Sequence, residues 1–453
     1  MTDSEDNDRP ETYRPETYRA VPSSRVGRLS GFGRMAGGLA GGMMAEGARR
    51  LAAGERPSMD QLILTPGNVK RVTDRLSHLR GAAMKLGQMI SMDAGDVLPP
   101  ELTEILAGLR DRANFMPPKQ LDKVLREQWG PDWRKQFRRF EPRPIAAASI
   151  GQVHRAVTRD NRTLAIKVQY PGIAQSIDSD VDNVATLLSV SGLLPKHLNL
   201  DPLLAAAKEQ LHEEADYERE GAMMQAYAKL LKDEPDFVIP ELDESLTRER
   251  ILAMSFEPGS AIESLTEEPQ EARNQLFAKM MRLVARELFE FGFMQTDPNF
   301  ANFRYNRETG RIILLDFGAT RQIEPAVISA YRNLLEAGLA RDPERVLQAS
   351  FEADFVSPQT VEKHRASIDR MIDIIVDEMA SEEDFDFGDR AFVPILRDEG
   401  MAIAQDKEAW HVPPPETLFV QRKVSGTALL GARLGAVVNI RNIVERVLAD
   451  NPA

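Results

Sequence analysis

The chain has 453 residues, of which 42% are hydrophobic, and this content is enough for roughly two or three domain cores. Its net charge of −13 argues against a sequence-independent nucleic-acid binder, because such a protein needs a basic surface to displace counterions from phosphates. The absence of cysteine excludes disulfides, thiolate chemistry and cysteine-based zinc sites, and the six histidines lack metal-ligand spacing.

The N-terminus, "MTDSEDNDRPE", is acidic and has no basic stretch leading into an apolar segment. It therefore predicts neither a secretory signal peptide nor a transit peptide. No run approaches the ~20 apolar residues that cross a bilayer as a helix. The apolar text near the C-terminus is interrupted by Arg433, Arg441 and Glu445. We therefore expect a cytoplasmic protein without a transmembrane span.

Residues 1–30 are polar and rich in proline, and they contain the tandem repeat "RPETYRPETYR", which predicts a disordered arm. Beyond them, Gly33, Gly37 and Gly41 recur at every fourth residue. They would form a smooth ridge on a helix, or else a flexible loop, since glycine costs ~1 kcal/mol per residue in a helix. The neighbouring apolar residues 35–45, flanked by arginines, favour peripheral contact with the inner face of a membrane.

Three helices are predicted before any strand. Apolar residues at helical spacing predict the first over 66–92, and it carries "KLGQ", with Lys85 and Gln88 on one face. The second begins after a proline pair at Glu101, and the third runs through "KQLDKVLREQW". Together with the glycine-rich segment, these helices form an N-terminal extension over residues 31–135.

Strand patterns begin after this extension. "ASIGQVHRAV", the turn "TRDNR" and "TLAIKVQY" predict a β-hairpin, followed by helices near 173–193 and 201–232 and by strands in "FVIP" and "ERILAMSF". A hinge at "EPGS" separates a smaller lobe, 136–258, from a mostly helical larger lobe, 259–453, which is interrupted by the loop "QTDPNFANF" and the strand "RIILLDFG". This order predicts an α+β, bilobed, protein-kinase-like fold.

The motifs of phosphoryl transfer occur in the order that this fold requires. Lys167, in "LAIKVQY", matches the strand lysine that contacts the α- and β-phosphates of ATP. Asp297 and Asn302 have the D-x-x-x-x-N spacing of a catalytic loop, and Asp316 follows nineteen residues after Asp297 in "LLDFG". Spacing alone leaves open which glutamate pairs with the lysine. The candidates are Glu213, Glu214, Glu218 and Glu220.

Four stretches together resemble the UbiB and ADCK group of atypical kinase-like proteins, over about residues 60 to 330. "KLGQ" is similar to the K-x-G-Q helix of the family and "AAAS" to its alanine-rich loop, while "EADYERE" and "QTDPNFANF" resemble its E-x-D element and catalytic loop. The resemblance implies a role in ubiquinone biosynthesis or lipid homeostasis. It also implies ATP and Mg²⁺ as cofactors, and as further partners a quinone-precursor lipid and the proteins of a biosynthetic complex.

The resemblance also assigns roles to particular residues. It implies that Glu220 pairs with Lys167, that Asp297 is the base, and that Asn302 and Asp316 hold Mg²⁺. It further implies a nucleotide-contacting set in which alanines replace the glycines of an ordinary kinase loop and crowd the phosphates. The members of this set, besides Lys167 and Glu220, are Ala146, Ala147, Ala148, Ser149, Lys85, Gln88, Glu214 and Asp216.

Three functional interpretations remain open. The leading one is an Mg-ATP-dependent ATPase or small-molecule or lipid kinase. Protein phosphorylation is disfavoured, because "LLDFGATRQIEP" is followed directly by a sequence that predicts a helix, with no activation segment between them. The second interpretation is a nucleotide-gated pseudokinase that serves as a scaffold or extracts lipids. The third is a kinase of the aminoglycoside or choline type, a class that lacks the K-x-G-Q helix.

Overall fold

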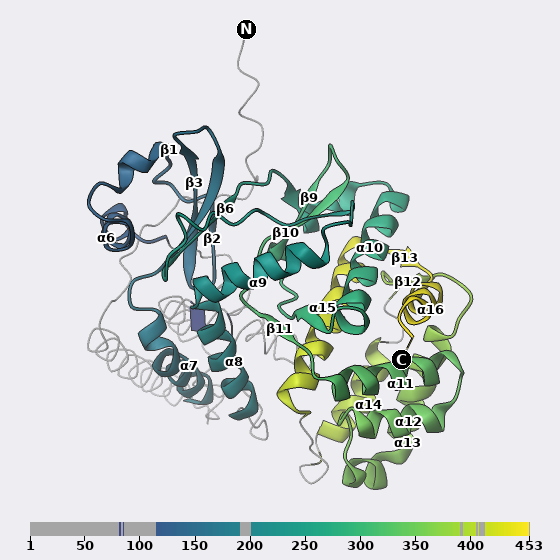
Figure 1. Ribbon diagram of the computed structural model, residues 1–453. Coiled ribbons are helices and arrows are strands. Elements are labelled where there is room, and N and C mark those ends of the chain that lie inside the picture. Colours follow the sequence, from purple (N-terminus) through teal and green to yellow (C-terminus); the bar gives the residue numbers. More distant parts are fainter. Residues whose placement is uncertain are drawn as a thin grey trace, which may run out of the picture.

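The computed structural model describes Gly81, Ala82 and Lys85, together with residues 115–190, 201–389, 393–404, 406 and 413–452. The disordered arm, the glycine-rich ridge, the helix beginning at Glu101 and most of the helix expected over 66–92 lie outside these residues. The described chain forms two lobes that lie side by side (Figure 1). It mixes helices with sheets, and this confirms the α+β, bilobed, kinase-like fold.

The smaller lobe is built on one antiparallel sheet. Its strands are β1 (Phe137–Phe140), β3 (Gly151–Thr158), β4 (Thr163–Gln169) and β6 (Ile251–Ser255), in that spatial order, with β2 (Ala146–Ala147) added beside β3. Strand β4 is central and is buried at every position after Thr163, as a strand covered on both faces must be. The predicted hairpin is confirmed: β3 pairs with β4 around a turn in which Asn161 takes a positive φ.

Helices α6 (Pro118–Trp129), α7 (Ile177–Val190), α8 (Asp201–Glu214) and α9 (Tyr217–Leu230) accompany this sheet, with short 3-10 turns η2 (Trp133–Gln136) and η3 (Ala174–Ser176). The expectation of one helix over 201–232 is wrong, because the chain breaks between α8 and α9. Asp216 leaves the helical region (φ −102°, ψ 89°), and its carboxylate accepts a hydrogen bond from the Arg219 amide, which caps the new helix. The break places Glu214 and Glu220 on two different helices.

The larger lobe begins with a second, four-stranded sheet. Its spatial order is β5 (Phe237–Val238), β10 (Arg311–Leu314), β9 (Phe303–Asn306) and β7 (Ser260–Ala261), and only the β5–β10 pair is parallel. Strand β5 precedes the hinge in the chain yet pairs within this sheet. Strands β8 (Phe293–Gln295) and β11 (Thr320–Gln322) form a separate antiparallel pair. The intervening helical elements are η4 (Ile262–Glu267), α10 (Gln270–Phe289) and η5 (Phe300–Asn302).

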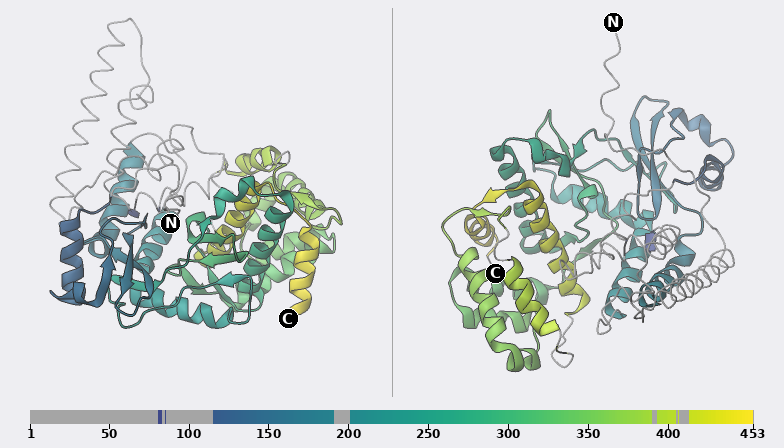
Figure 2. Two further views of the ribbon diagram at one scale, coloured as in Figure 1. Left: turned by 90° about the horizontal axis from the view of Figure 1, so that it is seen from above. Right: turned by 180° about the vertical axis from the view of Figure 1, so that it is seen from behind.

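The remainder of the larger lobe is helical (Figure 2). Helices α11 (Pro325–Leu339), α12 (Pro343–Glu352), α13 (Pro358–Met379), α14 (Val393–Ala404), α15 (Pro415–Leu434) and α16 (Ile440–Asp450) follow, with a small pair of strands, β12 (Phe385–Asp386) and β13 (Val437–Val438). Helix α15 reaches both cores, because Phe419 is buried with the smaller lobe while Leu430 is buried with the larger one. Within the described ranges, no helix is long and apolar enough to cross a membrane.

Candidate active site

Lys167 is the centre of the first of two buried ionic clusters between the lobes. It points from β4 towards α9, where its Nζ lies 2.7 Å from Oε1 of Glu220, and it lies 3.0 Å from Oδ2 of Asp316, just beyond β10. Burial lowers the pKa of Lys167, but the two carboxylates outweigh burial and hold that pKa well above its ordinary value. Burial also raises the pKa of Glu220 to about 7, against the opposing effect of Lys167.

Asn302 and Asp316 are brought together by the strand pairing of β9 with β10. Phe303 pairs with Leu314, and the Leu315 amide donates to the Asn302 carbonyl oxygen at 3.0 Å. Asn302, directly before β9, and Asp316, two residues after β10, therefore lie at the same end of the ladder. The Gly318 amide donates to Oδ1 of Asp316 at 3.1 Å and orients the carboxylate. Burial opposes ionisation of Asp316, but Lys167 outweighs it and lowers the pKa.

This donor set fits Mg²⁺. A carboxylate and an amide oxygen are hard oxygen ligands, and Mg²⁺ ordinarily takes one or two protein ligands and completes its shell with water and phosphate oxygens. The Asn302 side chain donates through Nδ2 to the Asp297 carbonyl oxygen at 3.4 Å, so its Oδ1 is the atom left to face a cation. Across the described part of the chain, His, Cys, Asp and Glu nowhere gather in threes as an all-protein metal cage.

Lys85 is the centre of the second cluster. It is only 2% exposed, and its Nζ lies 2.5 Å from Oε1 of Glu214 and 3.2 Å from Oδ2 of Asp297. Burial lowers the pKa of Lys85, but Asp297 and Glu214 outweigh it and the net shift is upward. Burial raises the pKa of Glu214 despite the nearby ammonium. A lysine that precedes the whole kinase-like region therefore contacts the candidate base directly.

The alanine-rich loop closes onto the second cluster. Ala146 and Ala147 form β2, and the Ala148 amide donates to the Gly151 carbonyl oxygen at 2.9 Å. The next residue, Ser149, donates from Oγ to Oε2 of Glu214 at 2.5 Å. Gly81 lies close against this loop, since a Cβ added to it would lie 2.8 Å from the Ser149 carbonyl oxygen. The loop, Glu214 and Lys85 thus form one connected unit.

The other sequence candidates lie as follows. Glu213 pairs with Arg219 and Arg321, and Glu218 is exposed on α9, so among the four glutamates the structure pairs Glu220 with Lys167. Asp216 is exposed and caps α9. Gln88 lies outside the described residues.

Sequence reasoning missed Arg219, which ties α9 to the segment after Asp316. Its Nη1 donates to the Gly318 carbonyl oxygen at 2.6 Å, and its Nη2 donates to the Thr320 carbonyl oxygen at 2.7 Å. Arginine offers several fixed donors and can hold two carbonyl groups at once. The sequence signal was its position one residue before Glu220, but a charged run on a helix more often indicates a solvated face.

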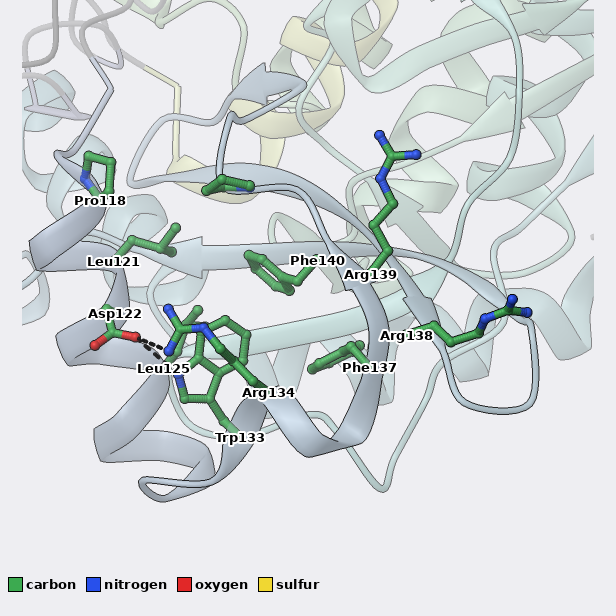
Figure 3. A pocket seen from close by; sticks show the side chains of 11 residues that line it. Pro118, Leu121, Asp122, Leu125, Trp133, Arg134, Phe137, Arg138, Arg139 and Phe140 are labelled. Atoms are coloured by element: carbon green, nitrogen blue, oxygen red, sulfur yellow. Dashed lines mark hydrogen bonds and ion pairs between the residues drawn. The ribbon is translucent and has the colours of Figure 1, made fainter.

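A separate concavity of about 260 Å³ lies between α6 and β1 (Figure 3). Trp133 and Phe137 are among the residues that line it, as are Arg138 and Arg139 of β1. Arg134 extends over the Trp133 ring and pairs with Asp122 at 2.8 Å. Neither lysine cluster contributes to its lining, so this concavity is distinct from the candidate active site.

A two-lobed fold that brings together a strand lysine, a helix glutamate, a loop with D-x-x-x-x-N spacing and a second aspartate beyond the next strand is typical of a kinase-like protein. Residues 108–350 match the ABC1 atypical kinase-like domain. The chain belongs to this family of atypical kinases, and its resemblance to the UbiB and ADCK group is confirmed.

Relatives agree with this assignment. The chain is 37% identical over 433 residues to the protein of Saccharomyces cerevisiae named atypical kinase COQ8, mitochondrial, covering 95% of this chain and 86% of that protein. It is 36% identical over 438 residues to atypical kinase coq-8, mitochondrial, of Caenorhabditis elegans, covering 94% of this chain but 58% of that protein.

A solved structure is also similar. It is the complex of Rv3197 with erythromycin from Mycobacterium tuberculosis, with a TM-score of 0.58 and 25% sequence identity, covering 82% of this chain and 93% of that one.

Proposed function

We propose that this protein binds Mg-ATP and acts as an atypical kinase or ATPase that supports ubiquinone biosynthesis or lipid homeostasis at a membrane surface. The single observation that carries the chemistry is the convergence of Lys167, Glu220 and Asp316 beside Asp297 and Asn302. The pathway is inferred from the family and from the relatives named atypical kinase COQ8. Bound Mg²⁺ would neutralise charge on the transferred phosphoryl group.

Each residue has a defined task in this proposal. Lys167 would contact the α- and β-phosphates, and Glu220 would hold its ammonium in place. Asn302 and Asp316 would hold Mg²⁺. Asp297 would accept the proton of the attacking hydroxyl group or water. Lys85 lies 3.2 Å from that carboxylate. During turnover Lys85 would therefore either move away from Asp297 or keep its ion pair while Asp297 accepts the proton, and we expect a slow basal rate.

The acceptor would be water or a small molecule, such as a quinone-precursor lipid. From Gly318 the chain runs through β11 into α11, which begins at Pro325, with no long activation segment between them. A protein substrate would therefore find no platform beside the site. Peripheral membrane contact and association with other biosynthetic proteins belong to the same proposal.

A second function is a nucleotide-gated pseudokinase scaffold. The observation that favours it is the burial of Lys85 against Asp297, together with the bond from Ser149 to Glu214, since both place side chains where catalysis would need space. In this alternative, nucleotide binding would organise partner proteins or lipids without turnover.

The test is Mg²⁺-dependent ATP turnover by the purified protein, with and without anionic liposomes. Asp297→Asn should lower turnover about 10²-fold or more, which is the contribution of a positioned general base. Asp377→Asn, an exposed aspartate on α13, is the matched control and should equal the parent. Turnover that survives in Asp297→Asn would refute the assigned base. ATP binding without turnover in the parent, even with liposomes, would establish the scaffold.

A further inference from the structure

Lys423 is a buried charge that the proposed chemistry does not use. It lies on α15, only 1% exposed, and its Nζ donates to Oε1 of Gln295 at 2.8 Å. It also forms an ion pair with Glu287 of α10, at 3.4 Å from Nζ to Oε2, and that side chain is 0% exposed. Helices α10 and α15 pack against one another in the larger lobe (Figure 1).

Gln295 connects this lysine with the candidate metal ligand. It ends β8, two residues before Asp297, and its Nε2 donates to the main-chain oxygen of Asp316 at 3.1 Å. A lysine ammonium can only donate, so its bond to Oε1 determines which way the glutamine amide points and turns Nε2 towards Asp316. The backbone amide of Gln295 donates to Oε1 of Glu287 at 3.0 Å, which fixes the strand end as well.

The carboxylate of Glu287 is also connected, through Tyr227, to Phe317, the residue after Asp316. The hydroxyl group of Tyr227, on α9, donates to Oε1 of Glu287, and the Tyr227 ring packs on Phe317 with ring centroids 5.2 Å apart. Phe317 itself donates its amide to Oε1 of Glu220 at 3.4 Å. Lys423 and Glu287 therefore sit in a buried polar network that contacts Asp316 and Phe317 through Gln295 and Tyr227.

Stability does not explain this arrangement. Desolvating two charges costs about as much as their attraction returns, and apolar residues of similar volume often serve a core better than a buried ion pair. What the pair supplies here is orientation, because it directs an amide at the backbone of a metal ligand.

We propose that Lys423 is a positioning residue that orients Asp316 for Mg²⁺ through the side chain of Gln295. Helix α15 thereby controls the geometry of the proposed metal site. This role rests on the proposed function, because Asp316 holds Mg²⁺ only if the protein binds Mg-ATP.

Two variants break the hydrogen-bonded link from Lys423 through Gln295 to Asp316 in different ways. Lys423→Met combined with Glu287→Gln removes the donor to Gln295 without leaving either buried charge unpaired. Gln295→Met removes the bridge alone, so the test survives if the double variant fails to fold. Thr427→Val is the matched control, because it deletes a buried hydroxyl group of the same helix that donates only to the Lys423 carbonyl oxygen.

The measurement is ATP affinity, by calorimetry on the full chain, first with EDTA and then across a Mg²⁺ titration. Residues that orient metal ligands contribute about 10- to 100-fold to metal affinity. We therefore expect both link variants to raise the half-saturating Mg²⁺ concentration about tenfold, while metal-free ATP affinity stays within about twofold of the parent. Thr427→Val should follow the parent in both conditions.

The outcomes separate this role from the proposed function. If the ATP affinity of the parent protein does not change with Mg²⁺ concentration, the proposed metal site is refuted, and the role of Lys423 is refuted with it. A responsive parent with unchanged link variants would refute the role alone. An equal rise in Thr427→Val would show general loosening of α15 and would also overturn it.

Discussion

Two buried lysines lie at the candidate site, and each one lies between a glutamate and an aspartate. Lys167 joins Glu220 to Asp316, and Lys85 joins Glu214 to Asp297. The first lysine comes from the central strand of the sheet, whereas the second comes from a segment that precedes the described smaller lobe. The partner aspartates differ in their proposed tasks, since Asp316 would hold a metal and Asp297 would take a proton.

This difference implies opposite effects on chemistry. Lys167 lies beside the proposed metal ligand, where the phosphates of a bound nucleotide would also lie, so its contacts could be exchanged for contacts to nucleotide. Lys85 forms an ion pair with the carboxylate that would act as the base, and that contact occupies the oxygen that would have to accept a proton. One cluster is thus suited to binding nucleotide and the other to restraining turnover.

The largest expected effect comes from breaking the first cluster. Lys167→Met should lower Mg-ATP turnover about 10²- to 10³-fold, the scale of losing one preorganised donor at developing charge. The assay is phosphate release at saturating nucleotide. Lys229→Met, an exposed lysine on the same helix as Glu220, serves as the control. Turnover within tenfold of the parent would mean that the two lysines do not differ in the way we describe.

The raised pKa of Glu220 predicts a pH dependence of stability. Because its pKa is about 7 in the fold against 4.5 ordinarily, the native state holds a proton that the unfolded state releases between those values. The contribution of Glu220 to the free energy of unfolding therefore falls as pH rises through this window, by about 3 kcal/mol at most. Denaturant unfolding at pH 5 and pH 8 should show a smaller decrease for Glu220→Gln. Parallel pH curves would contradict the shift.

Removing the second cluster should raise ATP turnover, whereas breaking the first cluster should lower it. Lys85→Met combined with Glu214→Gln frees Asp297 without leaving a buried carboxylate unpaired, and basal ATP turnover should rise about tenfold, a fraction of what a general base can contribute. Lys208→Met, on the same helix as Glu214 but paired with Asp182, controls for a lost lysine. Equal or lower turnover in the double variant would show that Lys85 supports the chemistry instead of restraining it.

The smallest effect concerns the turn that separates the two glutamates. Asp216→Ala removes the cap of α9 and should lower the free energy of unfolding by about 1 kcal/mol, whereas Asp216→Asn keeps an accepting oxygen and should restore most of it. Thermal or denaturant unfolding measures both. A stable alanine variant would show that packing alone holds the break between α8 and α9.

Much of this protein was determined by its sequence alone. The apolar residues around Lys167 predict one strand of a β-hairpin, which the structure confirms. The spacing of Asp297, Asn302 and Asp316 predicts a catalytic loop and a metal site, and these roles stay predictions. These features are local, because strand periodicity and turn residues act over a few positions. The one local error, a single helix over 201–232, arose because Asp216 reads as an ordinary charged helix residue until its capping bond is seen.

The contacts that give the site its character required the tertiary structure. Lys85 and Asp297 are 212 residues apart, Ser149 and Glu214 are 65 apart, and Lys423 and Gln295 are 128 apart. No periodicity reports which side chains meet over such separations, because the meeting depends on how helices and sheets pack. Spacing left four glutamates open as partners of Lys167, and only the family resemblance pointed to Glu220, which the packing bears out. The contact of Lys423 with Gln295 had no signal in the sequence and was decided by packing.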